Sequence, residues 1–451
     1  MRPAVSPFLT DLYQLNMVEA YLARGTTETA VFEFFVRRLP EKRNFVMAAG
    51  LEQVLLFLED LRFTPDDIAW LASTGRFTPR LLDYLAGFRF TGDIHAVPEG
   101  TVVFGNEPIL RVTAPLPAAQ FVETRLMNLV HFQTLIASKA ARSVLVASGR
   151  LLVDFGFRRA HGAEAGLLAA RASYIAGFAG TATVEAERSF GIRTFGTMAH
   201  SFIEAHDNEA DAFLDFARAR PEGLTFLIDT YDTERAARTV VRIAPKLQAA
   251  GIRIGAVRID SGDLGVLSRR VRRILDDGGL DTVTIFVSGG LDEHDVAALL
   301  ADGAPIDGFG VGTSLTTSDD LPALDCAYKL QEYAGVPRRK LSPGKATWPG
   351  RKQIWRRYDG SGKMAGDTLS VADDDQPGTP LLTPVMVGGA RVGPAPTLHE
   401  IRAHAAKELG SLPEPLRRLE KAEPYPVAIG ERLAGLAAEA DRRIASMGVN
   451  P

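Results

Sequence analysis

Polar side chains that could bind an anion or accept a transferred group follow short apolar runs in the middle of the chain. We expect the run Ile192–Met198 to form a short buried strand, and His200 follows it at once. Polar groups just past the end of a buried strand are where α/β enzymes place their chemistry. His200 is therefore either a reacting group or a structural histidine that hydrogen-bonds to the backbone, and this stretch alone favours neither.

A second candidate group combines an arginine with a carboxylate. Arg258 and Asp260 are two residues apart at the end of another apolar run, so in a strand they point to the same side. An arginine fork matches a carboxylate or a phosphate, and an aspartate suits a sugar diol or a metal-bound phosphate. The structural alternative is an ion pair with no role in binding.

Two glycine-containing loops suit phosphate groups. Ser288, Gly289 and Gly290 precede a predicted helix, whose first backbone N–H groups favour an anion. Gly310, Gly312 and Thr313 follow the next apolar run, and paired phosphate loops late in a barrel recur in that fold. Each loop is a weak signal alone, and neither has the Gly-Lys-Ser/Thr ending of a P-loop.

The elements that must position these residues are a series of alternating strands and helices. Six apolar runs lie mostly about 30 residues apart, the size of a βαβ unit: Leu151–Phe155, Ile192–Met198, Leu224–Ile228, Ile252–Ile259, Val283–Val287 and Ile306–Val311. This alternation predicts a parallel sheet. We expect an irregular or incomplete α/β barrel rather than a doubly wound sheet. Its strand ends then converge on one site, built by Arg158, Thr197, His200, Asp229, Arg258, Asp260, Ser288 and Thr313.

The rest of the chain predicts two further regions. Residues 1–116 read as an N-terminal α/β domain, with a helix from Asp11 to about Ala23, a strand over Thr29–Val36 and turn-rich strands over Gly92–Val112. The barrel is expected over residues 117–335. Residues 336–451 hold a basic segment (Arg338–Lys352), a strand within Leu381–Val387 that returns to the N-terminal sheet, and C-terminal helices.

Composition narrows the functional class. The 451 residues are 46% hydrophobic and 24% charged, with a net charge of −4 and one cysteine, Cys326, which excludes a disulfide framework and a multi-cysteine zinc site. We find no signal peptide and no membrane span, and expect a cytoplasmic protein that binds neither nucleic acid nor membrane. No histidine zinc motif, Gly-x-Ser-x-Gly elbow or strand-end lysine is present, so we predict no protein-held metal centre, serine hydrolase or Schiff-base aldolase.

Together the motifs resemble one enzyme family, the nicotinate phosphoribosyltransferases. Seven stretches occur in the family's order over roughly residues 8 to 355, and all seven in order are far more specific than any one: Thr10–Gln14, Asp154–Arg159, Gly196–Phe202, Leu227–Asp232, Arg258–Leu264, Ser288–Glu293 and Gly308–Thr313. The resemblance implies an N-terminal α/β domain and the irregular α/β (TIM-like) barrel of type II phosphoribosyltransferases, in a homodimer with the site near the subunit interface.

The resemblance also implies a reaction. Nicotinate and 5-phosphoribosyl 1-pyrophosphate give nicotinate mononucleotide and pyrophosphate, coupled to ATP hydrolysis, as the first committed step of NAD salvage from nicotinate. The enzyme is then a glycosyltransferase that is also classed as an ATP-dependent ligase, with Mg²⁺ to neutralise the leaving pyrophosphate.

Site roles carry over from the matching motifs. His200 falls on the phosphorylated histidine, and Tyr13, Thr197 and Arg258 fall on nicotinate contacts. Phosphoribosyl pyrophosphate is contacted by Thr313, while Phe155 matches an aromatic that stacks on the pyridine and Arg158 an arginine near the 5′-phosphate. Asp260 is suited to hold the ribose hydroxyls. The glycosyl step itself needs positioning and charge stabilisation rather than a histidine nucleophile.

Two alternatives stay open at this level. The chain could be a sibling glycosyltransferase for nicotinamide or quinolinate, although relatives that use nicotinamide tend to carry an acidic residue where Ala182 stands here. It could also be a catalytically silent barrel that senses phosphorylated ligands. The basic segment Arg338–Lys352 could contact ATP or pyrophosphate, or it could be a solvated loop. The sequence also leaves open which subunit supplies Tyr13.

Overall fold

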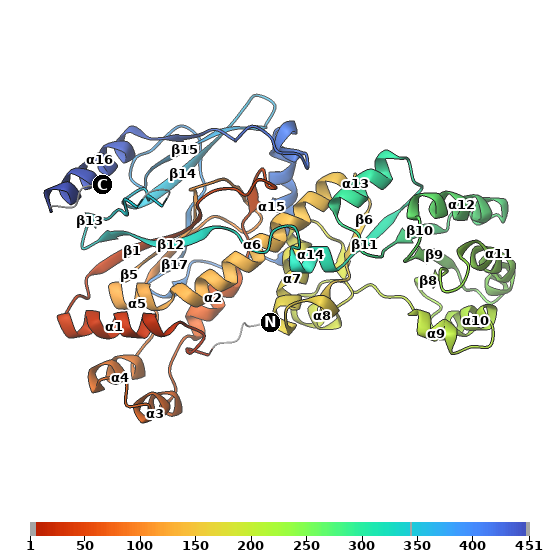
Figure 1. Cartoon of the computed structure of the whole chain (residues 1–451), viewed down its shortest axis with the longest axis horizontal. Helices are drawn as coiled ribbons and strands as arrows, with labels where there is room; N and C mark the ends of the chain where they lie inside the picture. The colour runs from red at the N-terminus through yellow and green to blue at the C-terminus, as the bar shows by residue number, and fades with distance from the viewer. Residues whose placement is uncertain (1–5, 343–344, 448–451) are drawn as a thin grey trace. The chain divides into compact units, whose positions relative to one another are not determined.

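The chain divides into two compact units in the computed structural model, which describes residues 6–342 and 345–447 (Figure 1). Unit 1 combines residues 1–138 with 323–451, and unit 2 is residues 139–322. The first division falls inside helix α6 (Glu123–Val146). These boundaries lie at different places from the predicted ones at residues 116 and 335.

Unit 1 is built on a seven-stranded sheet. β1 (Thr29–Val36) is an almost continuous apolar run, and it is buried between two antiparallel neighbours, β5 and β12. The return strand expected within Leu381–Val387 is confirmed, because β17 (Thr383–Val387) pairs antiparallel with β3. The strand order is β13-β12-β1-β5-β3-β17-β18, where the other strands are β3 (Asp93–Ala96), β5 (Pro108–Pro115), β12 (Cys326–Tyr333), β13 (Val336–Pro337) and β18 (Ala390–Arg391).

Helices pack against this sheet. Helix α1 begins one residue after the predicted start at Asp11, with Asp11 rather than Thr10 at the N-cap position, and it ends where Gly25 adopts a left-handed φ of 73°. Helix α1 packs on α5, and α5 packs on β1 and β5 (Figure 1). The helices of this part are α1 (Leu12–Arg24), α2 (Leu51–Asp60), α3 (Pro65–Ser73), α4 (Pro79–Ala86), α5 (Leu116–Phe121), α15 (Leu398–Ser411) and α16 (Glu431–Ser446), with a 3₁₀ turn, η2 (Glu414–Arg417).

A four-stranded sheet, ordered β16-β14-β15-β19, accompanies the larger one in unit 1. Its strands are β14 (Lys352–Tyr358), β15 (Met364–Val371), β16 (Thr379–Pro380) and β19 (Val427–Ile429), and a separate pair is β2 (Val46–Met47) with β4 (Val102–Val103). Several cations of the basic segment Arg338–Lys352 make ion pairs within unit 1: Arg339 with Asp441, Arg351 with Glu332 and Lys352 with Glu33. These three cations therefore support the fold of unit 1.

Unit 2 is a curled parallel sheet with helices between its strands, as the strand–helix alternation predicts. The order β7-β6-β11-β10-β9-β8 follows the neighbour sequence of a barrel, but β7 and β8 are not paired among the described residues, so a closed barrel is not observed. The strands are β6 (Leu151–Asp154), β7 (Gly180–Thr181), β8 (Leu224–Leu227), β9 (Ile254–Ile259), β10 (Thr284–Val287) and β11 (Gly308–Val311).

One strand prediction was wrong. The run Ile192–Met198 is not a strand: only Thr194 forms an isolated bridge, to Thr181 of the two-residue strand β7. Two apolar residues of the run, Ile192 and Met198, are buried. Its backbone lies so close to Gly180 that a Cβ there would be 2.1 Å from the carbonyl oxygen of Arg193. The segment therefore runs beside β7 with a single bridge and forms no strand of its own.

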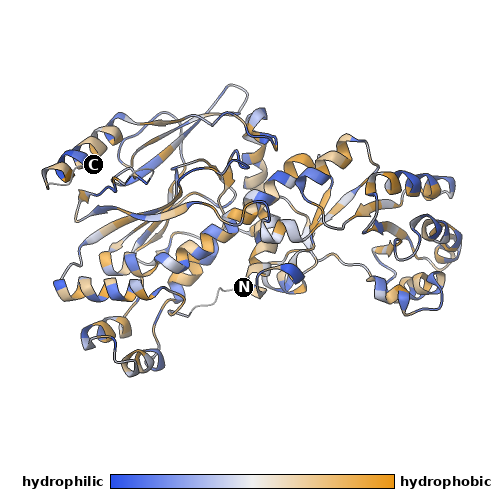
Figure 2. Ribbon diagram, in the orientation of Figure 1, coloured by the Kyte–Doolittle hydropathy of each residue, from blue (hydrophilic) through white to orange (hydrophobic). Residues whose placement is uncertain are grey.

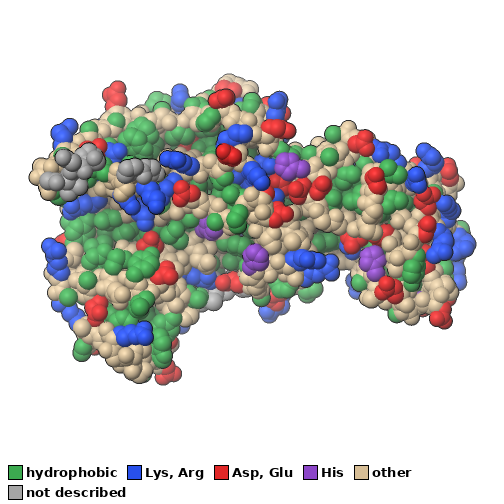
Figure 3. Space-filling view, in the orientation of Figure 1, with side chains coloured by type: hydrophobic (Ala, Val, Ile, Leu, Met, Phe, Trp, Pro, Cys, Tyr) green, Lys and Arg blue, Asp and Glu red, His purple; other side chains and the backbone are tan. Residues whose placement is uncertain are grey.

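Two long helices of unit 2, α11 and α12, each have one apolar and one polar side. Helices α11 and α12 show both colours along their length in Figure 2, and their buried residues recur at helical spacing. In Figure 3 acidic and basic side chains are interspersed over these helices, in keeping with ion pairs such as Arg270–Glu234. The helices of unit 2 are α7 (Ala163–Ala176), α8 (Val184–Phe190), α9 (His200–Glu204), α10 (Glu209–Ala219), α11 (Thr233–Ala249), α12 (Leu264–Asp277), α13 (Glu293–Ala301) and α14 (Thr313–Thr317). Within the described part of the chain, no helix combines the length and apolar character needed to cross a bilayer.

Candidate active site

A cavity of about 570 Å³ lies at the carboxyl ends of the strands in unit 2. Its volume is in the range of small-molecule sites. The sheet brings six of the predicted site residues to its walls: Phe155, Arg158, Thr197, His200, Arg258 and Asp260. Phe155 and Arg158 follow β6, Arg158 within the 3₁₀ turn η1 (Phe157–Arg159), while Arg258 lies near the end of β9 and Asp260 directly after it.

Arg258 is held by three neighbours from different segments. Its Nε donates to the Ser288 hydroxyl at 2.8 Å, one terminal nitrogen donates to the Thr197 hydroxyl at 3.3 Å, and the other donates to Asp260 at 2.7 Å. The guanidinium also lies 5.3 Å from the centre of the Phe155 ring. These contacts fix a flat cation beside an aromatic face, which is suited to a planar anion.

Asp260 is kept ionised by its neighbours. Burial works against the charged form, but the Ser288 hydroxyl donates to Oδ1 at 2.5 Å and Arg258 adds a positive charge, so the pKa of Asp260 is lowered. The backbone N–H of Asp260 donates to Asp229 at 3.0 Å. Asp229, which follows β8, also accepts from the Ser261 hydroxyl at 2.5 Å. The predicted convergence of the strand ends after β8, β9 and β10 is therefore observed here.

His200 begins helix α9, and its side chain is 40% exposed. Its Nδ1 lies 3.1 Å from the hydroxyl of Thr230, and its Nε2 lies 3.9 Å from Asp260 Oδ2. Thr230 thus orients the ring so that Nε2 is on the side of the carboxylate. The sequence indicates Thr230 only as a member of the loop after β8 and predicts no role for it.

The ring of Phe155 depends on glycines in β11 and after it. A Cβ on Gly310 would lie 2.6 Å from the Phe155 ring, and one on Gly312 would lie 3.2 Å from its carbonyl oxygen. Phe286 of β10 supports the ring from another side, with 5.8 Å between ring centres. Gly310 and Gly312 therefore have a packing role in this structure, and they do not themselves line the cavity.

Ser288, Gly289 and Gly290 lie beside the cavity rather than on its wall. Ser288 contacts Arg258 and Asp260 as described, and Gly289 has a φ of 106° with a Cβ position only 2.0 Å from the Asp260 carbonyl oxygen. Helix α13 follows, capped by Asp292. Its first residue, Glu293, is anchored through ion pairs of 2.8 Å to Lys139 and to Arg142 on α6.

A buried carboxyl that sequence reasoning did not assign lies below the cavity. Asp154, the last residue of β6, accepts from the Gly156 N–H and the Thr181 hydroxyl, both at 2.8 Å. Burial outweighs these two bonds and raises the pKa of Asp154 to about 6. The carboxyl ties β6 to β7 directly beneath Phe155, so it shapes the turn that carries the predicted stacking residue.

Two further predicted site residues, Tyr13 and Thr313, do not line this cavity. Tyr13 is in unit 1, on α1, where its side chain is 46% exposed. Thr313 starts α14 after Gly312 and is not among the lining residues. Their predicted roles stay predictions.

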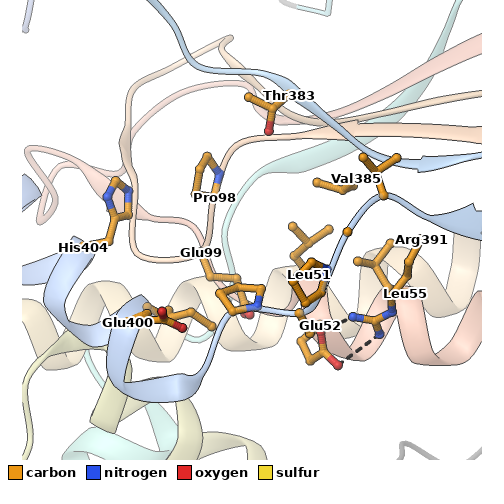
Figure 4. A pocket seen from close by; sticks show the side chains of 16 residues that line it. Leu51, Glu52, Leu55, Pro98, Glu99, Thr383, Val385, Arg391, Glu400 and His404 are labelled. Atoms are coloured by element: carbon orange, nitrogen blue, oxygen red, sulfur yellow. Dashed lines mark hydrogen bonds and ion pairs between the residues drawn. The ribbon is translucent and has the colours of Figure 1, made fainter.

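A different cavity, of about 260 Å³, lies in unit 1 and is mostly apolar (Figure 4). Leu51, Leu55, Pro98 and Val385 point into it. Its polar groups are already partnered: Arg391 with Glu52 and Glu59, and His404 with the Thr101 hydroxyl. It holds none of the predicted site residues, so the cavity in unit 2 is the candidate active site.

Comparison with known proteins finds relatives over most of the chain. Three family models match: the nicotinate phosphoribosyltransferase (NAPRTase) N-terminal domain over residues 8–131, the NAPRTase family over 151–337 and the nicotinate phosphoribosyltransferase C-terminal domain over 378–437. The chain is 50% identical to a nicotinate phosphoribosyltransferase of Mycobacterium tuberculosis over 437 residues, covering 96% of this chain and 94% of the relative. It is 38% identical to that of Bacillus subtilis over 456 residues, covering 94% and 92%.

Solved structures give the same result. The human nicotinic acid phosphoribosyltransferase superposes with a TM-score of 0.86 at 29% identity, covering 96% of this chain and all of that one. A nicotinate-nucleotide pyrophosphorylase from Pyrococcus furiosus superposes with a TM-score of 0.74 at 25% identity, covering 91% and 98%. With its predicted site residues gathered at one cavity and relatives aligned over nearly its whole length, the chain belongs to the nicotinate phosphoribosyltransferase family.

Proposed function

We infer that this protein transfers the phosphoribosyl group of 5-phosphoribosyl 1-pyrophosphate to nicotinate and couples the transfer to ATP hydrolysis. The observation that carries this proposal is the cluster of Arg258, Asp260 and His200 at one cavity in a chain of this family. The products are nicotinate mononucleotide and pyrophosphate, and the reaction opens NAD salvage from nicotinate.

Nicotinate is a flat anion, and the surroundings of Arg258 suit it. Three of the five guanidinium N–H groups are used by Ser288, Thr197 and Asp260. Within the described part of the chain, the remaining two N–H groups have no partner and are available for the carboxylate of nicotinate. An arginine fork pairs well with a carboxylate. Phe155 beside the guanidinium supplies an aromatic face for the pyridine ring.

The glycosyl transfer forms a bond between the pyridine nitrogen and the ribose C1′ and breaks the bond from C1′ to the pyrophosphate oxygen. The electron pair of the broken bond leaves with pyrophosphate. Positive charge builds up on the ribose in the transition state, and the ionised Asp260 is placed to stabilise it or to hold the ribose hydroxyls. Arg158 is the candidate for the 5′-phosphate.

The residues around Asp260 also fit a divalent cation held jointly with substrate. Asp229 Oδ1 is buried without a hydrogen-bond partner in the described part of the chain, and the other oxygen of this carboxylate accepts the backbone N–H of Asp260. Mg²⁺ is usually held by one or two carboxylates, waters and substrate phosphates, and these two side chains are the ones that would hold it. The cation would neutralise the negative charge of the leaving pyrophosphate.

His200 is the proposed phosphate acceptor for the ATP-coupled step. An imidazole nitrogen is nucleophilic near neutral pH, and the ring here is partly exposed. Its Nε2 forms a bond to the γ-phosphorus of ATP while the bond to the ADP oxygen breaks, and water later cleaves the N–P bond to release phosphate. Phosphorylation adds negative charge beside the substrates.

A steady-state assay tests the proposal. With nicotinate, 5-phosphoribosyl 1-pyrophosphate and Mg²⁺, we expect nicotinate mononucleotide to form, faster when ATP is present. Absence of that product with and without ATP would overturn the assignment. Relative kcat/KM for nicotinate, nicotinamide and quinolinate identifies the acceptor. Ala182, which lines the cavity without a carboxylate, favours the anionic nicotinate over the amide.

A further inference from the structure

A row of charged side chains crosses one face of the seven-stranded sheet in unit 1. His95 of β3 lies opposite Arg111 of β5, and Arg111 lies opposite Glu33 of β1. Residues directly opposite each other in a sheet share a face. Asp93 and Thr113 are the next opposite pair along, two residues on, and lie on the same face. This face is therefore polar where a sheet covered by other elements is normally apolar.

A cavity of about 600 Å³ opens on this face, within unit 1. The sheet contributes Asp93, His95, Arg111 and Thr113 to its walls, and Arg351 and Arg432 come from the segment before β14 and from α16. Its size is that of a small-molecule site. Three arginines converge on a space that none of the proposed catalytic residues lines.

Arg111 is the one of the three that makes no ion pair among the described residues. It is only 5% exposed, and its single hydrogen bond runs from a terminal nitrogen to the Lys352 carbonyl at 2.8 Å. Its Nε is buried with no partner in the described part of the chain. Burial and the neighbouring Arg351 lower the pKa of Arg111, against the attraction of the Glu33 and Glu332 carboxylates. An unpaired buried charge is costly unless something compensates it.

The nearest buried carboxylate is already engaged. Glu33 is fully buried and lies 2.7 Å from Lys352 Nζ, which also donates to the carbonyls of Trp348 and Gly350. Three acceptors around one ammonium are the full set that a protonated lysine needs. One carboxylate thus faces two buried cations, and the cluster of Glu33, Lys352 and Arg111 has an excess positive charge.

The acids on the wall of the cavity make no ion pair with Arg111 among the described residues. Glu332 pairs with Arg351 at 2.8 Å, and Asp373 pairs with Arg432 at 3.2 Å. Asp93 keeps its negative charge, but its carboxylate is hydrogen-bonded to the backbone N–H of Gly388 at 2.8 Å. His95 has its pKa lowered by burial and by Arg111, so its ring stays neutral, and its buried Nδ1 has no partner among the described residues.

We propose that this cavity binds a small phosphorylated anion, with the phosphoryl oxygens accepting hydrogen bonds from Arg111 and His95. A phosphate offers several acceptor oxygens to a guanidinium fork and brings the charge that the cluster lacks. The volume leaves room for the organic part of a phosphate ester. The site is in unit 1, and its assignment does not depend on the proposed reaction.

Thermal unfolding and calorimetry with defined anions test the proposal. Inorganic phosphate and ribose 5-phosphate are each titrated against sodium chloride of equal ionic strength. We expect Arg111→Met to weaken one class of phosphate sites by about tenfold or more, because the guanidinium is its charged partner. Arg158→Ala, in the candidate active site, should leave that class intact. A stronger response to ribose 5-phosphate indicates an ester as the ligand, and an equal response indicates free phosphate.

A matched control and a second readout keep the test decisive. Arg391→Met removes an arginine of the same unit that already has two glutamate partners, and it should keep the phosphate response. If Arg111→Met does not fold, His95→Phe with ³¹P line broadening reports on the same site. Phosphate binding that is unchanged in the Arg111 variant, or a crystal soaked in phosphate that shows only water beside Arg111, would overturn the proposal.

Discussion

At the scale of single residues, we expect His200 to act in the coupling to ATP hydrolysis and not in the glycosyl transfer itself. The ring nitrogen Nε2 lies on the side of Asp260, yet the glycosyl transfer needs no nucleophile from the protein. We expect His200→Ala to abolish acid-labile ³²P incorporation from γ-labelled ATP while slow, ATP-independent synthesis of nicotinate mononucleotide continues. The measurement is acid-quenched labelling beside the product assay.

The control for this experiment is the neighbouring histidine. His206 contacts the Phe202 carbonyl through Nδ1 and lies outside the cavity wall, so His206→Ala should label like the wild type. Labelling that survives in His200→Ala would move the acceptor to another residue.

Asp154 gives the site a measurable pH dependence. Because burial raises its pKa to about 6, the folded state holds a proton that the unfolded state releases near pH 4. Its contribution to the free energy of unfolding is therefore most favourable below about pH 4 and declines as the pH rises to about 6, by up to roughly 3 kcal/mol. Asp154→Asn should remove this decline.

Denaturant unfolding between pH 4 and pH 8 measures the effect. The stability difference between Asp154→Asn and the wild type should shift in favour of the variant as the pH rises. Parallel pH profiles for the two proteins would show that the carboxyl is ionised throughout this range.

At the scale of elements, the loop between β10 and α13 fits the backbone of Asp260 closely. A Cβ on Gly289 would lie 2.0 Å from the Asp260 carbonyl oxygen, whereas Gly290 has open space around its Cβ position. Both have a positive φ, 106° and 70°. We expect Gly289→Ala to lower kcat/KM at least tenfold and stability by about 1–3 kcal/mol, because the clash displaces Asp260.

Gly290→Ala is the matched control for this loop. It carries only the cost of left-handed backbone, about 1–2 kcal/mol, without the clash. Circular dichroism and denaturant curves confirm folding, and the steady-state assay measures activity. Equal losses of activity in the two variants would mean that the clash with Asp260 is not what matters.

The elements also show what sequence can and cannot supply. The strand Thr29–Val36 is predicted at the bounds it has in the structure, because an almost continuous apolar run of this length is a strong signal for a buried strand. Ile192–Met198 misled the prediction, since this apolar run makes only a single bridge to β7 and forms no strand of its own. β7 itself has two residues, too few for any periodic signal.

The candidate site was predictable for a similar reason. Arg258 and Asp260 lie at a strand end in a recognisable motif, and they meet His200 at one cavity. Thr230, Asp154 and the excess charge at Arg111 were not assigned, because each depends on partners far away in the chain. Arg111 and Lys352, for example, are 241 residues apart in the chain and meet through a hydrogen bond that no local pattern encodes.

At the scale of the whole molecule, the family resemblance implies a homodimer with the site near the subunit interface. We predict that each active site of this dimer uses residues from both chains. Tyr13 is exposed on α1 beside Leu9 and Leu12, which are also exposed. Exposed apolar side chains in a group suit a subunit interface. We expect sedimentation to show a dimer, and we expect Tyr13 to complete the site of the other subunit.

Mixed dimers decide where Tyr13 acts. Tyr13→Ala and Arg258→Ala should each be nearly inactive alone. Co-expressed with different tags and isolated as a heterodimer, they should regain about half of wild-type activity per dimer, because one of the two sites then draws an intact Tyr13 and an intact Arg258 from different chains. A heterodimer as inactive as its parents would place Tyr13 and Arg258 of one site in the same chain, since both sites would then carry one substitution each.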